Sequence, residues 1–422
     1  MIRRAVVGVV CLATGFLAAC SSDASTTTDT VVRTATSAVE WLPCGDIECA
    51  RIDVPRVGSD LEGDTFKVAV YRRVSAKKKA PVLLLLPDRT FGYSARELVE
   101  DAPLTMGAVV RDYTLISLSP RGTVDSPLEL TDTNFLSSLD DVDDVFAVRR
   151  ELGFKKFAVM GWGTGATGAA ALVMTQPSQV LTAVLDSPQD PGESMVRQAE
   201  QQLASMQAAV VTAMRWCASH LSCPTNANVA QAFSQFKTNL RLGRLDAGID
   251  FDTIARAATN AIAQGDPQSL FIAINEASEG DGTKLLAMAG PVPTPESSRA
   301  ACANVSPSAA KRIATIFGDN AAKKTRHFYM GSEAFTYGFC DNLPATQRPI
   351  GEVAPAEGSK DVPVFVTIAR GDPVIPPYTP RTMAKRMGWT YKSVYANRHL
   401  VIGIDQAITA QAFEFLNTSL ND

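Results

Sequence analysis

The sequence predicts an α/β protein with a mainly parallel central sheet that is flanked by helices. From residue 40 onward, short apolar or β-branched runs alternate with longer stretches of helical pattern. Continuous apolar runs are typical of strands covered on both faces, and their alternation with helices is typical of a parallel sheet. The predicted strands are residues 66–71, 82–86, 114–118, 157–160, 183–185 and 364–368.

The composition agrees with one large folded core or two smaller ones. The chain has 422 residues, of which 46% are hydrophobic and 20% are charged, and these values exclude a disordered chain or a collagen-like repeat. Its formal net charge is −4. A mildly acidic chain has no bias toward phosphate backbones, so we expect no nucleic acid among its partners.

The N-terminus predicts export. Residues 1–19 start with Arg3 and Arg4, continue in a short apolar run and end in small residues, which is the pattern of a secretory signal peptide. Cys20 directly follows Leu-Ala-Ala, and this resembles the lipobox of bacterial lipoproteins, whose cysteine is acylated. An ordinary signal peptide with an incidental cysteine is the alternative.

Lipid on Cys20 would anchor the protein to the outer face of the cell membrane. Residues 20–39 are rich in Ser and Thr and lack aromatic side chains, so we expect a flexible tether.

Six cysteines remain in the exported body of the chain, and an even number outside the cytosol is usually paired. Fifteen connectivities are possible. Local spacing favours Cys44 with Cys49 and Cys217 with Cys223, which leaves Cys302 with Cys340. A zinc site is the rival interpretation, but the spacings are loose for zinc ligands and no histidine lies beside a cysteine pair.

The strand pattern disappears between residues 190 and 345. Long helical patterns take its place, including residues 196–216 and 229–242. We therefore expect a core made of residues 40–189 and 346–422, with residues 190–345 as a helical insertion that forms a lid.

The segment 157–172 carries the strongest functional signal. A buried-strand pattern is followed by Gly161-Trp162-Gly163-Thr164-Gly165 and then by a helix rich in small residues. A strand, a tight turn with glycine at both ends and a helix form the layout of the nucleophile elbow, G-x-S-x-G. Here the middle residue is Gly163, so the turn offers neither a hydroxyl nor a thiol.

Together these features resemble the α/β-hydrolase fold, and more narrowly the exported tripeptidyl-aminopeptidase-like (TAP-like) hydrolases of actinobacteria. The resemblance covers roughly residues 40–415 by order and spacing more than by identity. The residues that carry it are Trp41-Leu42-Pro43-Cys44, Pro120-Arg121-Gly122, the acidic helix of residues 140–153, the turn at 161–165, Val184-Leu185-Asp186, Gly371-Asp372 and His399.

In that family the catalytic triad runs in the order Ser, Asp, His. The resemblance assigns the acid to Asp372, the base to His399 and the nucleophile position to Gly163. It also places a ligand pocket beside the turn. The expected pocket residues are Trp162, Thr164, Asp88 and Arg89.

The loop that usually supplies oxyanion donors departs from the family pattern as well. In place of a Gly-Gly-Pro-Gly-like turn, residues 87–92 are Pro-Asp-Arg-Thr-Phe-Gly. Bulky and charged residues approach a substrate carbonyl less closely than glycines do. We therefore expect a catalytically defective hydrolase that binds a peptide, an acylated envelope component or a partner protein, without a metal or cofactor.

Two enzymatic alternatives stay open. One is an active peptidase or esterase with a relocated nucleophile, for which Thr164, Ser94, Ser117, Ser119 and Ser126 are candidates; the other is slow activation of water by His399. A third alternative is dinucleotide binding, because residues 163–168 spell G-x-G-x-x-G after a strand and Asp186 ends the next strand.

Overall fold

The computed structural model describes residues 39–419 except 59, 61, 108, 129–134, 221, 224–228, 246–247, 295–296, 323–336 and 344–347. The described residues from Val39 onward belong to one compact unit. The expected signal peptide, Cys20 and the tether up to residue 38 lie outside the described residues. Within the described ranges, no helix has the length and apolar character needed to cross a membrane.

Nine strands in the described part of the chain form one sheet in the order β1-β2-β3-β5-β4-β6-β7-β8-β9. The neighbours from β5 to β9 are parallel, whereas β1, β2, β3 and β5 pair in antiparallel fashion. The mainly parallel sheet is therefore confirmed. The strands are β1 (Leu42–Pro43), β2 (Glu48–Pro55), β3 (Thr65–Arg73), β4 (Val82–Leu86), β5 (Thr114–Leu118), β6 (Phe157–Trp162), β7 (Val180–Asp186), β8 (Val364–Ala369) and β9 (Thr390–Val394).

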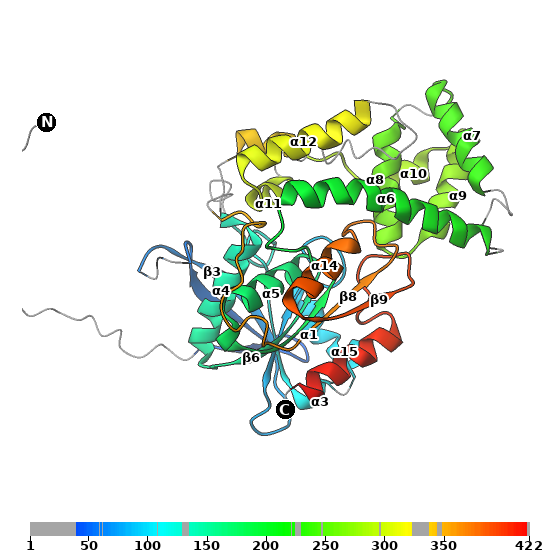
Figure 1. Cartoon of the computed structure of the whole chain (residues 1–422). Helices are drawn as coiled ribbons and strands as arrows, with labels where there is room; N and C mark the ends of the chain where they lie inside the picture. The colour runs from blue at the N-terminus through cyan, green and yellow to red at the C-terminus, as the bar shows by residue number, and fades with distance from the viewer. Residues whose placement is uncertain are drawn as a thin grey trace, which may run out of the picture. The chain divides into compact units, whose positions relative to one another are not determined.

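Helices follow most of the strands and also fill the segment between β7 and β8 (Figure 1). The α-helices are α1 (Ala95–Glu100), α2 (Ala102–Thr105), α3 (Val109–Asp112), α4 (Ser138–Leu152), α5 (Thr164–Thr175), α6 (Met195–Ala218), α7 (Val229–Arg241), α8 (Phe251–Ala263), α9 (Pro267–Ser278), α10 (Thr283–Ala289), α11 (Arg299–Ala303), α12 (Pro307–Ala322), α14 (Tyr378–Met387) and α15 (Gln406–Thr418). Short 3-10 helices are η2 (Pro177–Gln179) and η3 (Phe339–Asn342).

The sheet is covered on both faces, which explains its continuous apolar strands. In β4, Leu84 and Leu86 belong to a buried cluster with α4, α5 and α14, whereas Leu83 and Leu85 belong to a cluster with α1 and α15. Successive side chains of a strand point to opposite faces. A central strand between two helical layers must therefore be apolar at every position.

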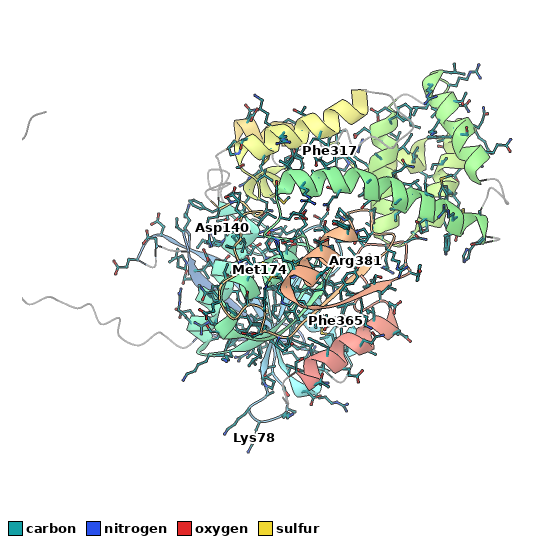
Figure 2. All side chains as sticks on the ribbon, viewed as in Figure 1. Lys78, Asp140, Met174, Phe317, Phe365 and Arg381 are labelled. Carbon is teal, nitrogen blue, oxygen red and sulfur yellow. A yellow bond between two sulfur atoms is a disulfide. The ribbon has the colours of Figure 1, made fainter. Side chains whose placement is uncertain are left out.

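The segment from α6 to α12, here called the helical insertion, has a buried cluster of its own. Figure 2 marks one residue of each cluster: Met174 of α5 and Phe365 of β8 lie on the two faces of the sheet, and Phe317 of α12 lies in the insertion. The expected helices 196–216 and 229–242 correspond to α6 and α7.

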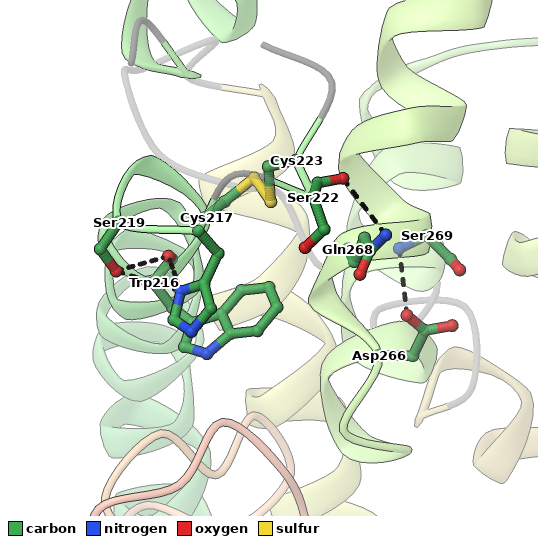
Figure 3. The surroundings of a disulfide bond; sticks show 9 residues. Trp216, Cys217, Ser219, Ser222, Cys223, Asp266, Gln268 and Ser269 are labelled. Atoms are coloured by element: carbon green, nitrogen blue, oxygen red, sulfur yellow. Dashed lines mark hydrogen bonds between the residues drawn. A yellow bond between two sulfur atoms is a disulfide. The ribbon is translucent and has the colours of Figure 1, made fainter. Parts of the chain in front are cut away.

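The structure contains the disulfides Cys44–Cys49, Cys217–Cys223 and Cys302–Cys340, the pairing that local spacing favours. These cysteines are therefore not zinc ligands. Figure 3 shows the Cys217–Cys223 bond at the end of α6, near the start of α9. There the Gln268 side chain donates a 3.2 Å hydrogen bond to the carbonyl oxygen of Ser222, which ties the disulfide loop to α9.

Candidate functional site

The tight turn between β6 and α5 lies at the centre of the candidate site. Gly163 has φ +51° and ψ −114°, a backbone conformation that L side chains rarely adopt. A Cβ on Gly161 would lie 2.6 Å from the carbonyl oxygen of Gly165, and a Cβ on Gly165 would lie 2.2 Å from that of Leu86. The two flanking glycines thus allow β4, β6 and α5 to approach each other closely.

The Asp88 carboxylate fills the space next to Gly163. Its Oδ2 accepts a 2.7 Å hydrogen bond from the backbone N–H of Thr164, the first residue of α5. Its Oδ1 accepts 2.7 Å hydrogen bonds from the N–H groups of Thr90 and Phe91. A Cβ on Gly163 would lie 1.9 Å from Asp88 Oδ2. The carboxylate therefore stands where a side chain at position 163 would begin, at a helix end that favours anions.

The expected acid and base are brought together from two strand ends. Asp372 follows β8 and His399 follows β9, and Nδ1 of His399 lies 2.8 Å from Oδ2 of Asp372. Oδ1 of Asp372 accepts hydrogen bonds of 2.8 and 2.9 Å from the N–H groups of Val374 and Ile375. Both partners are buried, with exposures of 2% for His399 and 1% for Asp372. The carboxylate is thus held in one orientation against the imidazole.

Burial acts to lower the pKa of His399, but attraction by Asp372 and the hydrogen bond to it outweigh burial. Asp88 and Asp186 add smaller contributions in the same direction, so the pKa of His399 is raised above its ordinary value. The Asp372 carboxylate thus stabilises the protonated form of the imidazole, as the acid of a catalytic triad does.

Asp186, at the end of β7, is a component of this site that the triad pattern did not indicate. Burial raises its pKa to about 6, although its carboxylate accepts hydrogen bonds from the N–H groups of Ile402 and Val401. The side chain is 0% exposed. Since a ribose could not reach it, the dinucleotide-binding alternative is wrong for this acid. The sequence indicated Asp186 only as the acid that ends a buried strand, in the Val184-Leu185-Asp186 segment of the family resemblance.

A cavity of about 260 Å³ lies beside these groups. The turn, the loop at residues 88–91 and His399 form one wall, and the helical insertion contributes another. The insertion residues are Met195, Gln202, Ser297, Ala300, Ala301 and Asn304. The structure thus brings Gly163, His399, Thr164, Asp88 and Arg89 to one cavity.

One of the expected pocket residues, Trp162, differs from expectation, and the side chain of another, Arg89, is already paired. Trp162 does not line this cavity: it is 6% exposed, and its indole N–H donates a 3.2 Å hydrogen bond to the carbonyl oxygen of Ile402. Arg89 does line the cavity, but its guanidinium forms a salt bridge of 2.6 Å with Asp141 and donates to the carbonyl oxygen of Arg121. Trp162 therefore packs the core, and the charge of Arg89 is already compensated.

The four serines considered as relocated nucleophiles do not line the cavity. Ser117 donates to the carbonyl oxygen of Leu85, Ser126 accepts from the N–H of Ala69, and Ser94 caps α1. Ser119 contacts Asp125 at 3.4 Å. Thr164 does line the cavity, but its hydroxyl accepts a 2.9 Å hydrogen bond from the backbone N–H of Arg89.

The helical insertion also holds in place the loop after β9 that carries His399. The N–H of His399 donates a 3.0 Å hydrogen bond to the carbonyl oxygen of Ala263, the last residue of α8. On the opposite wall, Asn304 Oδ1 accepts a 2.8 Å hydrogen bond from the N–H of Ser138, the first residue of α4. Both contacts join residues far apart in the chain, and no local pattern in the sequence indicates them.

Several solved structures resemble the chain at low sequence identity. Solved structures similar to the chain include an esterase from Thermogutta terrifontis (13% identity, 87% of this chain and 98% of that chain, TM-score 0.42) and naproxen esterase from Bacillus subtilis (11%, 88% and 92%, 0.43). Another is proline iminopeptidase from Mycobacterium smegmatis (13%, 88% and 99%, 0.38). No curated protein matches the chain.

A sequence model of one protein family, described as alpha/beta hydrolase fold, matches residues 92–403. The matched range runs from the loop after β4, through β5 to β9, to the residues just beyond His399. Because it spans more than half of the chain, the protein belongs to the alpha/beta hydrolase fold family.

Proposed function

We propose that the protein is a catalytically defective TAP-like hydrolase that binds a ligand in the cavity beside His399. The observation that carries this proposal is the Asp88 carboxylate, which accepts a hydrogen bond from the N–H of Thr164 beside a side-chain-free Gly163. The turn at 161–165 is then a nucleophile elbow that has lost its nucleophile.

Two losses support the absence of acyl transfer. Position 163 offers no attacking oxygen or sulfur, and removal of such a nucleophile costs about 10⁶ in turnover in a serine protease. The N–H that follows the nucleophile normally stabilises the oxyanion. Here that donor is the N–H of Thr164, which already binds Asp88. The loss of one oxyanion donor costs a further factor of roughly 10²–10³.

The open cavity supports binding over a purely structural role, because side chains leave about 260 Å³ free. Its lining offers the carboxylate of Asp88 and the side-chain amides of Gln189, Gln202 and Asn304. The carboxylate accepts hydrogen bonds and the amides both donate and accept them, which suits the N–H and C=O groups of a peptide. An acylated envelope component or a segment of a partner protein are the other ligands that we consider.

Export and lipid anchoring through Cys20 belong to the same proposal. The supporting features are the basic start, the apolar run and the small residues before Cys20. A Cys20→Ala variant expressed in an actinobacterial host should leave the membrane fraction, whereas a Cys11→Ala variant should stay there. Equal membrane retention of both variants would contradict lipid attachment at Cys20.

The activity test compares the wild type with Gly163→Ser and with Asp88→Gly/Gly163→Ser. Wild type should neither be labelled by a fluorophosphonate probe nor hydrolyse aminoacyl or short-acyl esters. Gly163→Ser alone should also stay unlabelled, because its Cβ would collide with Asp88 Oδ2. The double variant removes this collision and frees the N–H of Thr164, so we expect labelling there.

A triple variant that also carries His399→Ala controls for the base. Labelling should be lost again, because the serine then has no partner to accept its proton. Labelling of the wild type within the cavity would refute the proposal.

The second candidate is an active hydrolase with a different nucleophile. It is favoured by the intact contact of 2.8 Å between His399 and Asp372, which a pure binding protein does not require. In that case the wild type should turn over an ester substrate, and His399→Ala should abolish the turnover. Residual hydrolysis that is equal in the two proteins would exclude this candidate.

A further inference from the structure

A second cavity, separate from the one beside His399, lies between the helical insertion and the ends of β8 and β9. Its volume is about 540 Å³. The side chains come from α6, from the turn between α8 and α9, and from the loops after β8 and β9. Neither Gly163 nor Asp88 contributes to it. We call it the arginine cavity because of the side chains described next.

Three arginines line the arginine cavity: Arg215, Arg370 and Arg398. No aspartate or glutamate is among the lining residues. Nε of Arg370 donates to the hydroxyl of Ser393 at 3.1 Å, and Nε of Arg398 donates to the carbonyl oxygen of Leu400 at 3.0 Å. The ion pairs found among the described residues involve none of the three.

This cluster of positive charges lies in a protein whose formal net charge is negative, −4. Like charges that face one cavity repel each other, and the repulsion is relieved when an anion binds between them. Elsewhere in the molecule, Arg89, Arg121 and Arg256 each pair with a carboxylate. The arginine cavity therefore differs from the usual placement of arginine in this chain.

Two aromatic rings accompany the arginines. The guanidinium carbon of Arg370 lies 3.8 Å from the centre of the Tyr395 ring, and Tyr395 is 84% exposed. Trp216 stacks on His220 with ring centres 4.1 Å apart, and it lies next to the Cys217–Cys223 disulfide shown in Figure 3. Arg370 is thus held by a ring and a hydroxyl before any ligand binds, which lowers the entropy lost on binding.

Arg398 is the most enclosed of the three. A Cβ on Gly265, just after α8, would lie 3.3 Å from its guanidinium carbon. Burial lowers the pKa of Arg398, and attraction by Asp186 and Tyr93 opposes this effect. A partly desolvated cation gains more from an anionic partner than an exposed one does.

We propose that the arginine cavity binds an organic phosphate, with the phosphate group on the guanidinium groups and an apolar or aromatic part against Trp216 and Tyr395. Guanidinium groups match phosphate oxygens with paired hydrogen bonds. Three cations favour the dianion of a phosphate monoester over a single carboxylate. This site does not depend on the function proposed for the cavity beside His399.

The test uses the wild type, Arg215→Gln/Arg370→Gln and a matched control, Arg381→Gln/Lys385→Gln. The control removes two positive charges from α14, where Arg381 is labelled in Figure 2, and neither residue lines the arginine cavity. Binding of phenyl phosphate, inorganic phosphate and phenol is measured by calorimetry at two salt concentrations. Vesicles of phosphatidylcholine with and without phosphatidic acid test whether the bound phosphate group belongs to a lipid.

Phenyl phosphate should bind the wild type and the control equally and more tightly than inorganic phosphate, and phenol should not bind. The loss of two guanidinium groups should weaken binding by about tenfold or more. Binding to phosphatidic acid vesicles that shows the same pattern would identify a lipid headgroup as the source; free phosphate binding alone would identify a soluble ligand. Equal affinity of the double variant and the control, or no saturable binding to the wild type in any arm, would overturn the proposal.

Discussion

His399 lies among three carboxylates, and each is fixed by backbone N–H groups. Asp372 binds two such groups, Asp88 binds three and Asp186 binds two. Backbone donors cannot rotate away, so the negative charges stay near the imidazole once the chain is folded. This residue-scale arrangement stabilises an imidazolium ion, which is the form that a histidine base reaches when it accepts a proton.

The first prediction concerns the titration of His399. Its pKa should lie above the ordinary value of about 6.5, because Asp372, Asp88 and Asp186 outweigh burial. Asp372→Asn removes the strongest attraction and leaves burial in place, so the pKa should fall. The chain has three histidines, and NMR signals of their rings can be assigned with His399→Ala. His220 serves as the internal control, and an unchanged midpoint for His399 in Asp372→Asn would contradict the prediction.

The second prediction concerns stability and Asp186. Its folded-state pKa of about 6 lies above the unfolded value of about 3.9. The folded state therefore binds more protons between these values, and the free energy of unfolding should fall as pH rises through this window. Asp186→Asn keeps an oxygen for the N–H groups of Val401 and Ile402 but cannot titrate.

The measurement is urea unfolding at pH 4 and pH 7 of the wild type, Asp186→Asn and Asp46→Asn, whose substituted residue is exposed. The difference between wild type and Asp186→Asn should change by about 2 kcal/mol between the two pH values. Asp46→Asn should follow the wild type. Parallel pH profiles of all three proteins would show that the Asp186 carboxyl does not have a raised pKa.

At the scale of elements, continuous apolar runs predicted the central strands well, and β4 and β5 have the expected bounds. β2 was not predicted, although the neighbouring antiparallel strand β3 was. The burial of β2 alternates over Ala50, Arg51, Ile52 and Asp53, which is the pattern of a strand with one exposed face. A search for unbroken apolar runs does not detect such a strand.

The candidate site was predictable to the extent that it depends on position along the chain. Gly163, Asp372 and His399 stand in family order, and the last two do meet at 2.8 Å. The position of the Asp88 carboxylate was not predictable, because its hydrogen bond with Thr164 spans 76 positions and depends on how β4 lies against β6. The hydrogen bond from the N–H of His399 to the carbonyl oxygen of Ala263 was not predictable for the same reason, because it also joins residues far apart in the chain.

The third prediction tests the close approach of β4, β6 and α5. Gly165→Ala would place a Cβ 2.2 Å from the backbone carbonyl oxygen of Leu86, and backbone atoms cannot yield as a flexible side chain can. We expect a loss of about 3 kcal/mol or more in the free energy of unfolding.

Gly338→Ala is the matched control, because Gly338 has φ −65° and its added Cβ would meet no atom within 4 Å. This substitution should be neutral or stabilising by about 0.4–1 kcal/mol. Both variants are compared with wild type by denaturant unfolding. Equal stability of the two variants would show that the turn at 161–165 relaxes more easily than its geometry indicates.

At the scale of the whole described unit, the helical insertion has its own buried cluster, but it also completes the sites of the core. It supplies one wall of the cavity beside His399, the carbonyl oxygen of Ala263 and the Arg215 side of the arginine cavity. Loss of order in the insertion should therefore affect both cavities while the sheet stays folded, since the sheet is covered by helices of the core.

The fourth prediction separates the two disulfides that belong to the buried cluster of the insertion. Cys302–Cys340 closes a loop with a sequence separation of 38, and Cys217–Cys223 closes one with a separation of 6. If cross-links act mainly by restricting the unfolded chain, removing the first should cost about 4 kcal/mol and removing the second about 2 kcal/mol. Cys302→Ala/Cys340→Ala should thus unfold at a lower denaturant concentration than Cys217→Ala/Cys223→Ala.

The Cys302→Ala/Cys340→Ala variant should also loosen α11, which lines the cavity beside His399 through Ala300 and Ala301. Hydrogen exchange of α11, compared with that of β6, reports this directly. Equal protection of α11 in both variants would mean that the buried cluster of the insertion, and not the cross-link, holds this wall in place.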